Sequence, residues 1–258
     1  MKTVVYLHGQ PGAQCELELS ASFVDRFEGQ LFVPDRSASE GVSFSDHMDA
    51  VAETVSKRAA GHPIHIVGFS VGAFVAMELA ARLGNGVSRL DLISAAAPLQ
   101  VGDFLPSMAG APVFSLALNN PENFVRLTQG QALVVRVAPW LLRSMLMKNA
   151  KGLDAQLSKT AAFRRVFDSA IREAMVENQS AYLRDITAYV QDWSSICAQV
   201  TAPTYIWHGT SDNWCPPQMA KALSAMLPNV HATKWLPEGS HFSTFKFTLD
   251  AISKKDQS

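Results

Sequence analysis

Short apolar runs alternate with longer helical patterns in the first third of the chain, and this alternation constrains the fold more than any other feature. Residues 3–7, 31–33 and 64–67 have the length and composition of buried strands. Between them, apolar residues recur at helical spacing over 44–60, and an alanine-rich helix is expected over 73–83. Strands that alternate with helices in this way predict parallel βαβ units, so we expect an α/β fold.

The pattern changes after the next predicted strand, at 90–93. From 99 to 195 helical periodicity dominates, with two helices expected over 163–193 and a break near Asn178. Strand-like runs return at 203–207 and 232–236, with a helix over 219–226 between them and a short last helix after His241. The sequence therefore predicts a core formed by 1–98 and 196–258, and a helical insertion formed by 99–195.

Composition restricts the function classes. The 258 residues are 48% hydrophobic and 17% charged, which suits a globular chain, and the net charge of -1 gives no field that would recruit nucleic acid or an anionic membrane. Charged residues and a proline interrupt the most apolar stretch, 132–147, so we expect no membrane span. We predict a small molecule as the partner. We also expect a cytoplasmic protein, present as a monomer or a homodimer.

The cysteines and histidines do not suggest a metal site. Cys15, Cys197 and Cys215 are widely spaced and odd in number, so free thiols are expected rather than disulfides. No two His or Cys residues share ligand spacing on one predicted element, and we predict neither a metal nor a cofactor.

A G-x-S-x-G motif, Gly68-Phe69-Ser70-Val71-Gly72, lies between a predicted strand and a predicted helix. A serine at the apex of so tight a turn is exposed to attack a substrate, and the glycines let neighbouring backbone approach. Serine is also a favoured helix N-cap, which is the simpler interpretation of Ser70. The strand before the motif and the helix after it favour a catalytic nucleophile.

A serine nucleophile requires a base and a carboxylate that orients the base. Asp212 and His241 both follow predicted strands, at the edge where parallel sheets place their ligand sites. Asp35 also follows a strand but precedes the serine, which makes Asp212 the preferred acid. We expect His8 and His208, which precede glycines at strand ends, to be buried supports.

With these residues in the order Ser70, Asp212, His241, the chain resembles an α/β-hydrolase with a helical cap over nearly its whole length. The resemblance implies that 99–195 is the cap and that His8-Gly9-Gln10-Pro11-Gly12 is the oxyanion loop. The backbone amides of Gln10 and Val71 would then hold the oxyanion. Residues 3–7 correspond to the third strand of the family, so the sheet is expected to have about six parallel strands, without the family's first two.

These residues predict a serine hydrolase that cleaves a small, mainly apolar ester, thioester or lactone through an acyl-enzyme on Ser70. The same triad also serves C–C bond hydrolysis, acyl transfer, perhydrolysis and lyase reactions, and a non-catalytic binding protein on this fold is the remaining alternative. Aromatic residues predicted to contact the substrate are Phe104, Phe124, Trp140 and Trp214.

Overall fold

A six-stranded, fully parallel sheet forms the centre of the computed structural model, which describes residues 2–37 and 41–254. The strand order is β2-β1-β3-β4-β5-β6, and each neighbouring pair is parallel. The strands are β1 (Thr3–Leu7), β2 (Leu31–Phe32), β3 (Ile64–Phe69), β4 (Val87–Ile93), β5 (Thr204–Gly209) and β6 (Val230–Leu236). The predicted sheet of about six parallel strands is confirmed.

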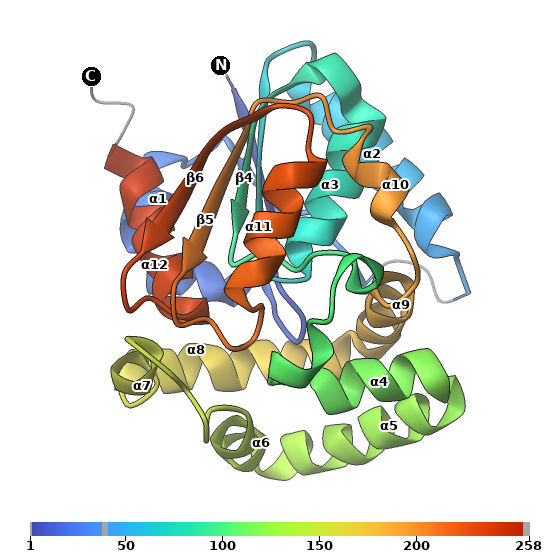
Figure 1. Ribbon diagram of the computed structural model, residues 1–258, viewed down its shortest axis with the longest axis vertical. Helices are drawn as coiled ribbons and strands as arrows, with labels where there is room; N and C mark the ends of the chain where they lie inside the picture. The colour runs from blue at the N-terminus through green and yellow to red at the C-terminus, as the bar shows by residue number, and fades with distance from the viewer. Residues whose placement is uncertain (1, 38–40, 255–258) are drawn as a thin grey trace.

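Helices cover both faces of the sheet (Figure 1). One face is covered by α2 (Phe44–Ala59), α3 (Gly72–Leu83), α10 (Ser194–Cys197) and α11 (Pro217–Met226). The other face is covered by α1 (Ala21–Arg26) and α12 (His241–Lys254), which pack against each other. Short 3₁₀ turns lie at Gln14–Leu19, Gly84–Gly86, Leu99–Val101 and Leu105–Ser107.

A layer of helices, which we call the helical segment (residues 99–195), lies beyond the carboxyl ends of the strands (Figure 1). It contains α4 (Ala111–Asn119), α5 (Pro121–Val137), α6 (Pro139–Leu146), α7 (Asp154–Leu157), α8 (Ala161–Arg172) and α9 (Gln179–Tyr189). A π-helical turn, Glu173–Glu177, separates α8 from α9, so the break predicted near Asn178 is confirmed. Among the described residues, no helix has both the length and the apolar character needed to cross a bilayer.

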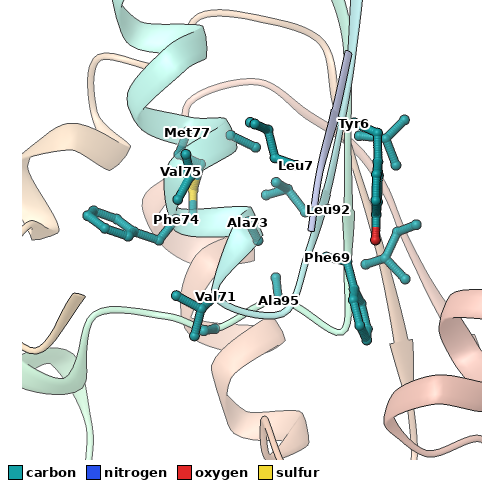
Figure 2. Packing of buried hydrophobic residues seen from close by; sticks show 14 of the residues in the cluster. Tyr6, Leu7, Phe69, Val71, Ala73, Phe74, Val75, Met77, Leu92 and Ala95 are labelled. Atoms are coloured by element: carbon teal, nitrogen blue, oxygen red, sulfur yellow. The ribbon is translucent and has the colours of Figure 1, made fainter. Parts of the chain in front are cut away.

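The core is built on alternation along the strands. Figure 2 shows Leu7 on the side of the sheet that α3 covers, and Tyr6 on the opposite side. Successive strand residues point to opposite faces, so a strand buried on both sides must be apolar throughout, and all five residues of β1 are buried. Phe69 lies on the same side as Tyr6, where it packs against Phe245 of α12 at a ring distance of 4.4 Å.

Some helices and strands begin or end at other residues than predicted. Helix α2 is capped by Ser43, whose side chain accepts a bond from the Asp46 amide at 3.1 Å, and it ends at Ala59, one residue before the predicted end. β4 begins at Val87, three residues before the predicted strand, because pairing with β3 extends it. The last helix has 14 residues and is not short, since Phe245, Leu249 and neighbouring side chains bury one of its faces.

Candidate active site

Ser70 occupies a strained turn between β3 and α3. Its φ of 58° lies in the left-handed region, which costs a residue with a side chain about 1–2 kcal/mol. Two glycines make the turn possible. A Cβ on Gly72 would overlap the Leu7 carbonyl oxygen, and one on Gly68 would come within 2.6 Å of the Ala76 Cβ. The motif thus places Ser70 at the carboxyl edge of the sheet, where it is 6% exposed.

Asp212 and His241 lie before and after β6 in the sequence, and the fold brings their side chains together. Asp212 follows β5, His241 is the first residue of α12, and the His241 Nδ1 lies 3.0 Å from Asp212 Oδ2. The Trp214 and Cys215 amides each donate to Asp212 Oδ1 at 2.9 Å. Burial would raise the pKa of Asp212, but His241, His208 and the Cys215 amide lower it below its usual value. An ionised Asp212 therefore holds the proton of His241 on Nδ1, which leaves a free lone pair on Nε2.

Ser70 and His241 line one small cavity, although no hydrogen bond joins the two side chains in the described structure. The His241 ring packs against Phe69 at 4.8 Å between ring centres and stacks on Trp214 at 5.6 Å. These rings fix the imidazole on the side of Ser70. Contacts between such groups often tighten only when a ligand is bound.

Cys215 and His208 support the site. The His208 ring is buried and bonds the Cys215 carbonyl at 2.8 Å, and burial lowers its pKa. The Cys215 thiol lies beside the Ser70 hydroxyl, and burial followed by the Asp212 charge raises its pKa well above its usual value. A raised pKa favours the protonated thiol, which is the less nucleophilic form. His8 is half-buried and hydrogen-bonded to the Gly9 carbonyl at 2.9 Å.

The loop after β1 is fixed by a buried ion pair. Gln10 Nε2 donates to Asp185 Oδ2 at 2.9 Å, and Arg36 Nη2 donates to the same oxygen at 2.5 Å. Arg36 also donates to the His8 carbonyl at 2.6 Å. Burial would raise the pKa of Asp185, but Arg36 and Arg184 lower it. Asp185 belongs to α9, so this pair ties the helical segment to the loop, a role that the sequence pattern did not predict.

An apolar cavity of about 50 Å³ opens from Ser70 toward the helical segment. Ser70 shares it with Gln10, Val71 and Trp214. Its apolar walls include Met108, Val113, Phe114, Leu142, Met175 and Ile186. A polar cavity of about 180 Å³ lies on the other side of Gln10, and Asp35 and Arg36 are among its lining residues.

The four aromatic residues predicted to contact substrate have different surroundings. Trp214 lines both the apolar cavity and the small cavity of Ser70 and His241. Phe104 and Phe124 are buried and do not line either cavity, with Phe124 packed on Tyr182. Trp140 is 55% exposed and also lines neither cavity. Periodicity marks such side chains as apolar but does not say which face of a helix meets the cavity.

Glu16 is a buried carboxyl group in the small cavity. It accepts a hydrogen bond from the Tyr6 hydroxyl at 2.9 Å, and its side chain packs against Gly12 of the loop. Burial raises the pKa of Glu16 to about 8. Sequence reasoning missed this residue, because it lies in a segment with no recognisable motif.

Asp154 of α7 caps the helix that carries His241. Its carboxylate accepts bonds from the Phe242 and Ser243 amides at 2.9 and 2.7 Å, which are in the first turn of α12. The preceding residue, Ser240, occupies the usual capping position, yet its hydroxyl is buried with no hydrogen-bond partner in the described structure. A distant part of the chain thus supplies the cap.

A family model described as the alpha/beta hydrolase family matches residues 4–248. The chain belongs to this family. A comparison with curated protein sequences found no match. Within the described residues, no group of three or more His, Cys, Asp or Glu side chains is arranged to hold a metal ion.

Solved structures share this hydrolase fold. A thermophilic esterase from Thermogutta terrifontis is 15% identical with a TM-score of 0.70, covering 100% of this chain and 88% of its own. MenH from S. aureus is 18% identical with a TM-score of 0.67, and the match covers 100% of this chain and 95% of MenH. A bromoperoxidase from Bacillus anthracis is 18% identical with a TM-score of 0.67, covering 99% and 92%. At these identities the similarity shows the fold and leaves the reaction open.

Proposed function

We propose that this hydrolase cleaves a small, mainly apolar carboxylic ester, thioester or lactone through an acyl-enzyme on Ser70. The observation that carries the proposal is the position of Ser70. Its strained turn opens into an apolar cavity, and it shares a second cavity with His241, which is bonded to the buried Asp212. A nucleophile, a base and an orienting carboxylate are the three groups that acyl transfer requires.

In the proposed mechanism, the Ser70 Oγ attacks the substrate carbonyl carbon while His241 Nε2 takes the hydroxyl proton. The tetrahedral intermediate collapses, the C–O or C–S bond to the leaving group breaks, and His241 protonates the departing oxygen or sulfur. A water molecule then attacks the acyl-enzyme and gives its proton to His241. Release of the carboxylic acid returns the proton to Ser70, and no cofactor takes part.

The backbone amides of Gln10 and Val71 are the proposed oxyanion donors. Both residues line the apolar cavity beside Ser70, and the bond from Gln10 to Asp185 holds the loop in place. Donors of this kind act on charge that appears only in the transition state, and removing one costs about 3 kcal/mol.

The size of the apolar cavity supports a short acyl group. A single water needs about 10–15 Å³ of such space, so about 50 Å³ admits only a small group unless neighbouring side chains move. Because most of its lining residues come from the helical segment, we propose that residues 99–195 act as a cap that selects the substrate.

The first test is hydrolysis of 4-nitrophenyl esters from acetate to decanoate by the wild type and by Ser70→Ala. We expect activity with a maximum at short chains, and a loss of at least about 10³-fold in kcat on substitution. Ser56→Ala, the same change on the exposed face of α2, should behave as the wild type. A fluorophosphonate should label the wild type and not Ser70→Ala.

The assignment of the acid is tested by Asp212→Asn and Asp35→Asn. An asparagine in place of Asp212 would not hold His241 in the required tautomer, so kcat should fall by about 10⁴-fold while the fold is kept. Asp35 bonds Ser37 and lines the polar cavity, away from both cavities of Ser70, so Asp35→Asn should retain activity. Equal losses in the two variants would contradict the assignment.

A chain that binds the fluorophosphonate at Ser70 but hydrolyses none of the esters would contradict ester hydrolysis. It would then favour C–C bond hydrolysis, acyl transfer, perhydrolysis or a lyase reaction on the same triad. A chain that is not labelled at all would favour a binding protein on the hydrolase fold.

A further inference from the structure

Two polar side chains of the helical segment line the cavity beside Ser70, in addition to Gln10 of the loop after β1. Gln131 lines this cavity, and its Oε1 is buried with no hydrogen-bond partner in the described structure. Tyr182 also lines it and is 2% exposed. Within the described ranges, 2–37 and 41–254, no side chain or backbone group bonds the Tyr182 hydroxyl, and burial is the only cause of its raised pKa.

Both side chains belong to the helical segment. Gln131 is on α5 and Tyr182 on α9, and these helices contact each other. The Tyr182 ring packs on Phe124, which precedes Gln131 by two helical turns on the same face of α5. Gln131 and Tyr182 therefore reach the cavity from the helical segment, whereas Ser70 and Val71 reach it from the turn between β3 and α3.

Unpaired polar groups are costly in such surroundings. Buried amides and hydroxyls in proteins nearly always have partners, and those without one often mark a place for a ligand or an ordered water. A plain hydrocarbon acyl group would cover Gln131 and Tyr182 and leave both unpaired. A site with buried polar groups selects strongly for a substrate that bonds them.

Taking the proposed ester hydrolysis as given, we propose that the acyl group of the substrate is hydroxylated. Its hydroxyl donates to the Gln131 side-chain oxygen, and an oxygen of the same acyl group accepts from the Tyr182 hydroxyl. The apolar walls hold the carbon skeleton, so the substrate is an ester of a short hydroxy acid rather than of a simple fatty acid.

The experiment compares 4-nitrophenyl 3-hydroxybutyrate with butyrate, and 6-hydroxyhexanoate with hexanoate. Each kcat/KM is divided by the rate of hydrolysis of that ester by hydroxide, which removes differences in intrinsic reactivity. For the wild type we expect the hydroxylated member of at least one pair to be preferred about tenfold. Gln131→Leu and Tyr182→Phe should each bring that preference close to one.

Gln129→Leu is the matched control, because it makes the same change two residues away on the exposed face of α5. It should keep the wild-type preference. A preference of one or less in both pairs would overturn the proposal and indicate that ordered water satisfies these groups. An equal loss of preference in Gln129→Leu and Gln131→Leu would also overturn it, because the preference would then not depend on the cavity.

Binding to Ser70→Ala provides a readout without chemistry. Calorimetry with 3-hydroxybutyramide, butyramide, 6-hydroxyhexanamide and hexanamide should show tighter binding of a hydroxylated amide, and Gln131→Leu in the same background should remove the difference. If plain esters are hydrolysed but no hydroxylated ligand is preferred, this inference fails and the proposed function stands. If no ester is hydrolysed but the hydroxylated amide is preferred, the proposed function fails, and only the recognition of a hydroxylated chain by Gln131 and Tyr182 remains.

Discussion

Glu16 is an ionisable side chain placed where ionisation is unfavourable. Burial raises its pKa to about 8, far above the ordinary value of 4.5. Between these values the folded chain keeps a proton that the unfolded chain has lost. The free energy of unfolding therefore falls as the pH rises through this window, by at most about 1.4 kcal/mol per pH unit.

Glu16→Gln removes this dependence and keeps an oxygen for the Tyr6 hydroxyl. We expect the variant to gain stability relative to the wild type as the pH rises from 5 to 8, measured by urea unfolding at several pH values. Glu18→Gln, an exposed change two residues away, should follow the wild type. Parallel curves for Glu16→Gln and the wild type would show that Glu16 does not titrate in this range.

At the scale of elements, a buried carboxylate joins three strands. Asp91 of β4 bonds His65 of β3 at 2.6 Å and Trp207 of β5 at 2.7 Å, and Arg89 donates to it at 2.6 Å. Burial would raise the pKa of Asp91, but His65 and Arg89 lower it to about 2. The charge is thus favoured inside the sheet because its partners compensate for its lost hydration.

Asp91→Asn should lower the free energy of unfolding at pH 7 by about 3 kcal/mol, because it leaves Arg89 without its counter-charge and the buried donors without a charged acceptor. The lowered pKa predicts that the wild-type advantage is present above pH about 4 and is lost as the pH falls toward 2. Guanidinium unfolding at pH 7 and pH 2.5 measures both effects. Asp103→Asn, a change at an exposed residue, should have little effect on stability. If Asp91→Asn gave the same unfolding curve as Asp103→Asn, the bonds of Asp91 would not stabilise the fold.

At the scale of the whole molecule, the helical segment holds the start of the helix that carries His241, the proposed base. Asp154 accepts the Phe242 and Ser243 amides and so holds the start of α12, where His241 lies. The first turn of a helix has no partners within the helix for its amides, and a carboxylate satisfies them and opposes the helix dipole. Loss of this contact should loosen both the helix start and His241.

Asp154→Ala should therefore lower the free energy of unfolding by about 1–2 kcal/mol and also lower kcat for 4-nitrophenyl butyrate. Ser43→Ala removes the cap of α2, which lies away from the site, and should lower stability without a change in kcat. Thermal unfolding and steady-state kinetics on both variants separate the two effects. If kcat were unchanged in Asp154→Ala, the contact of Asp154 with the start of α12 would have no part in placing His241.

Local chemistry determined much of the fold from the sequence alone. Apolar runs bounded by polar turn residues predicted β1 with its observed bounds, and helical spacing predicted α2. Gly68 and Gly72 predicted the tight turn at Ser70, because only residues without side chains fit against the Leu7 carbonyl and Ala76. Location in the cytoplasm and a monomeric or homodimeric state stay predictions.

The tertiary structure alone decided which distant groups meet. Glu16 lies beside Ser70, Asp185 on α9 bonds Gln10, and Asp154 caps α12, all across long separations in sequence. Periodicity shows that a side chain is apolar or polar, but the packing of one helix on another decides what it faces. For this reason the sequence determined the turn at Ser70, whereas only the folded chain shows which residues, Gln131 and Tyr182 among them, line the cavity.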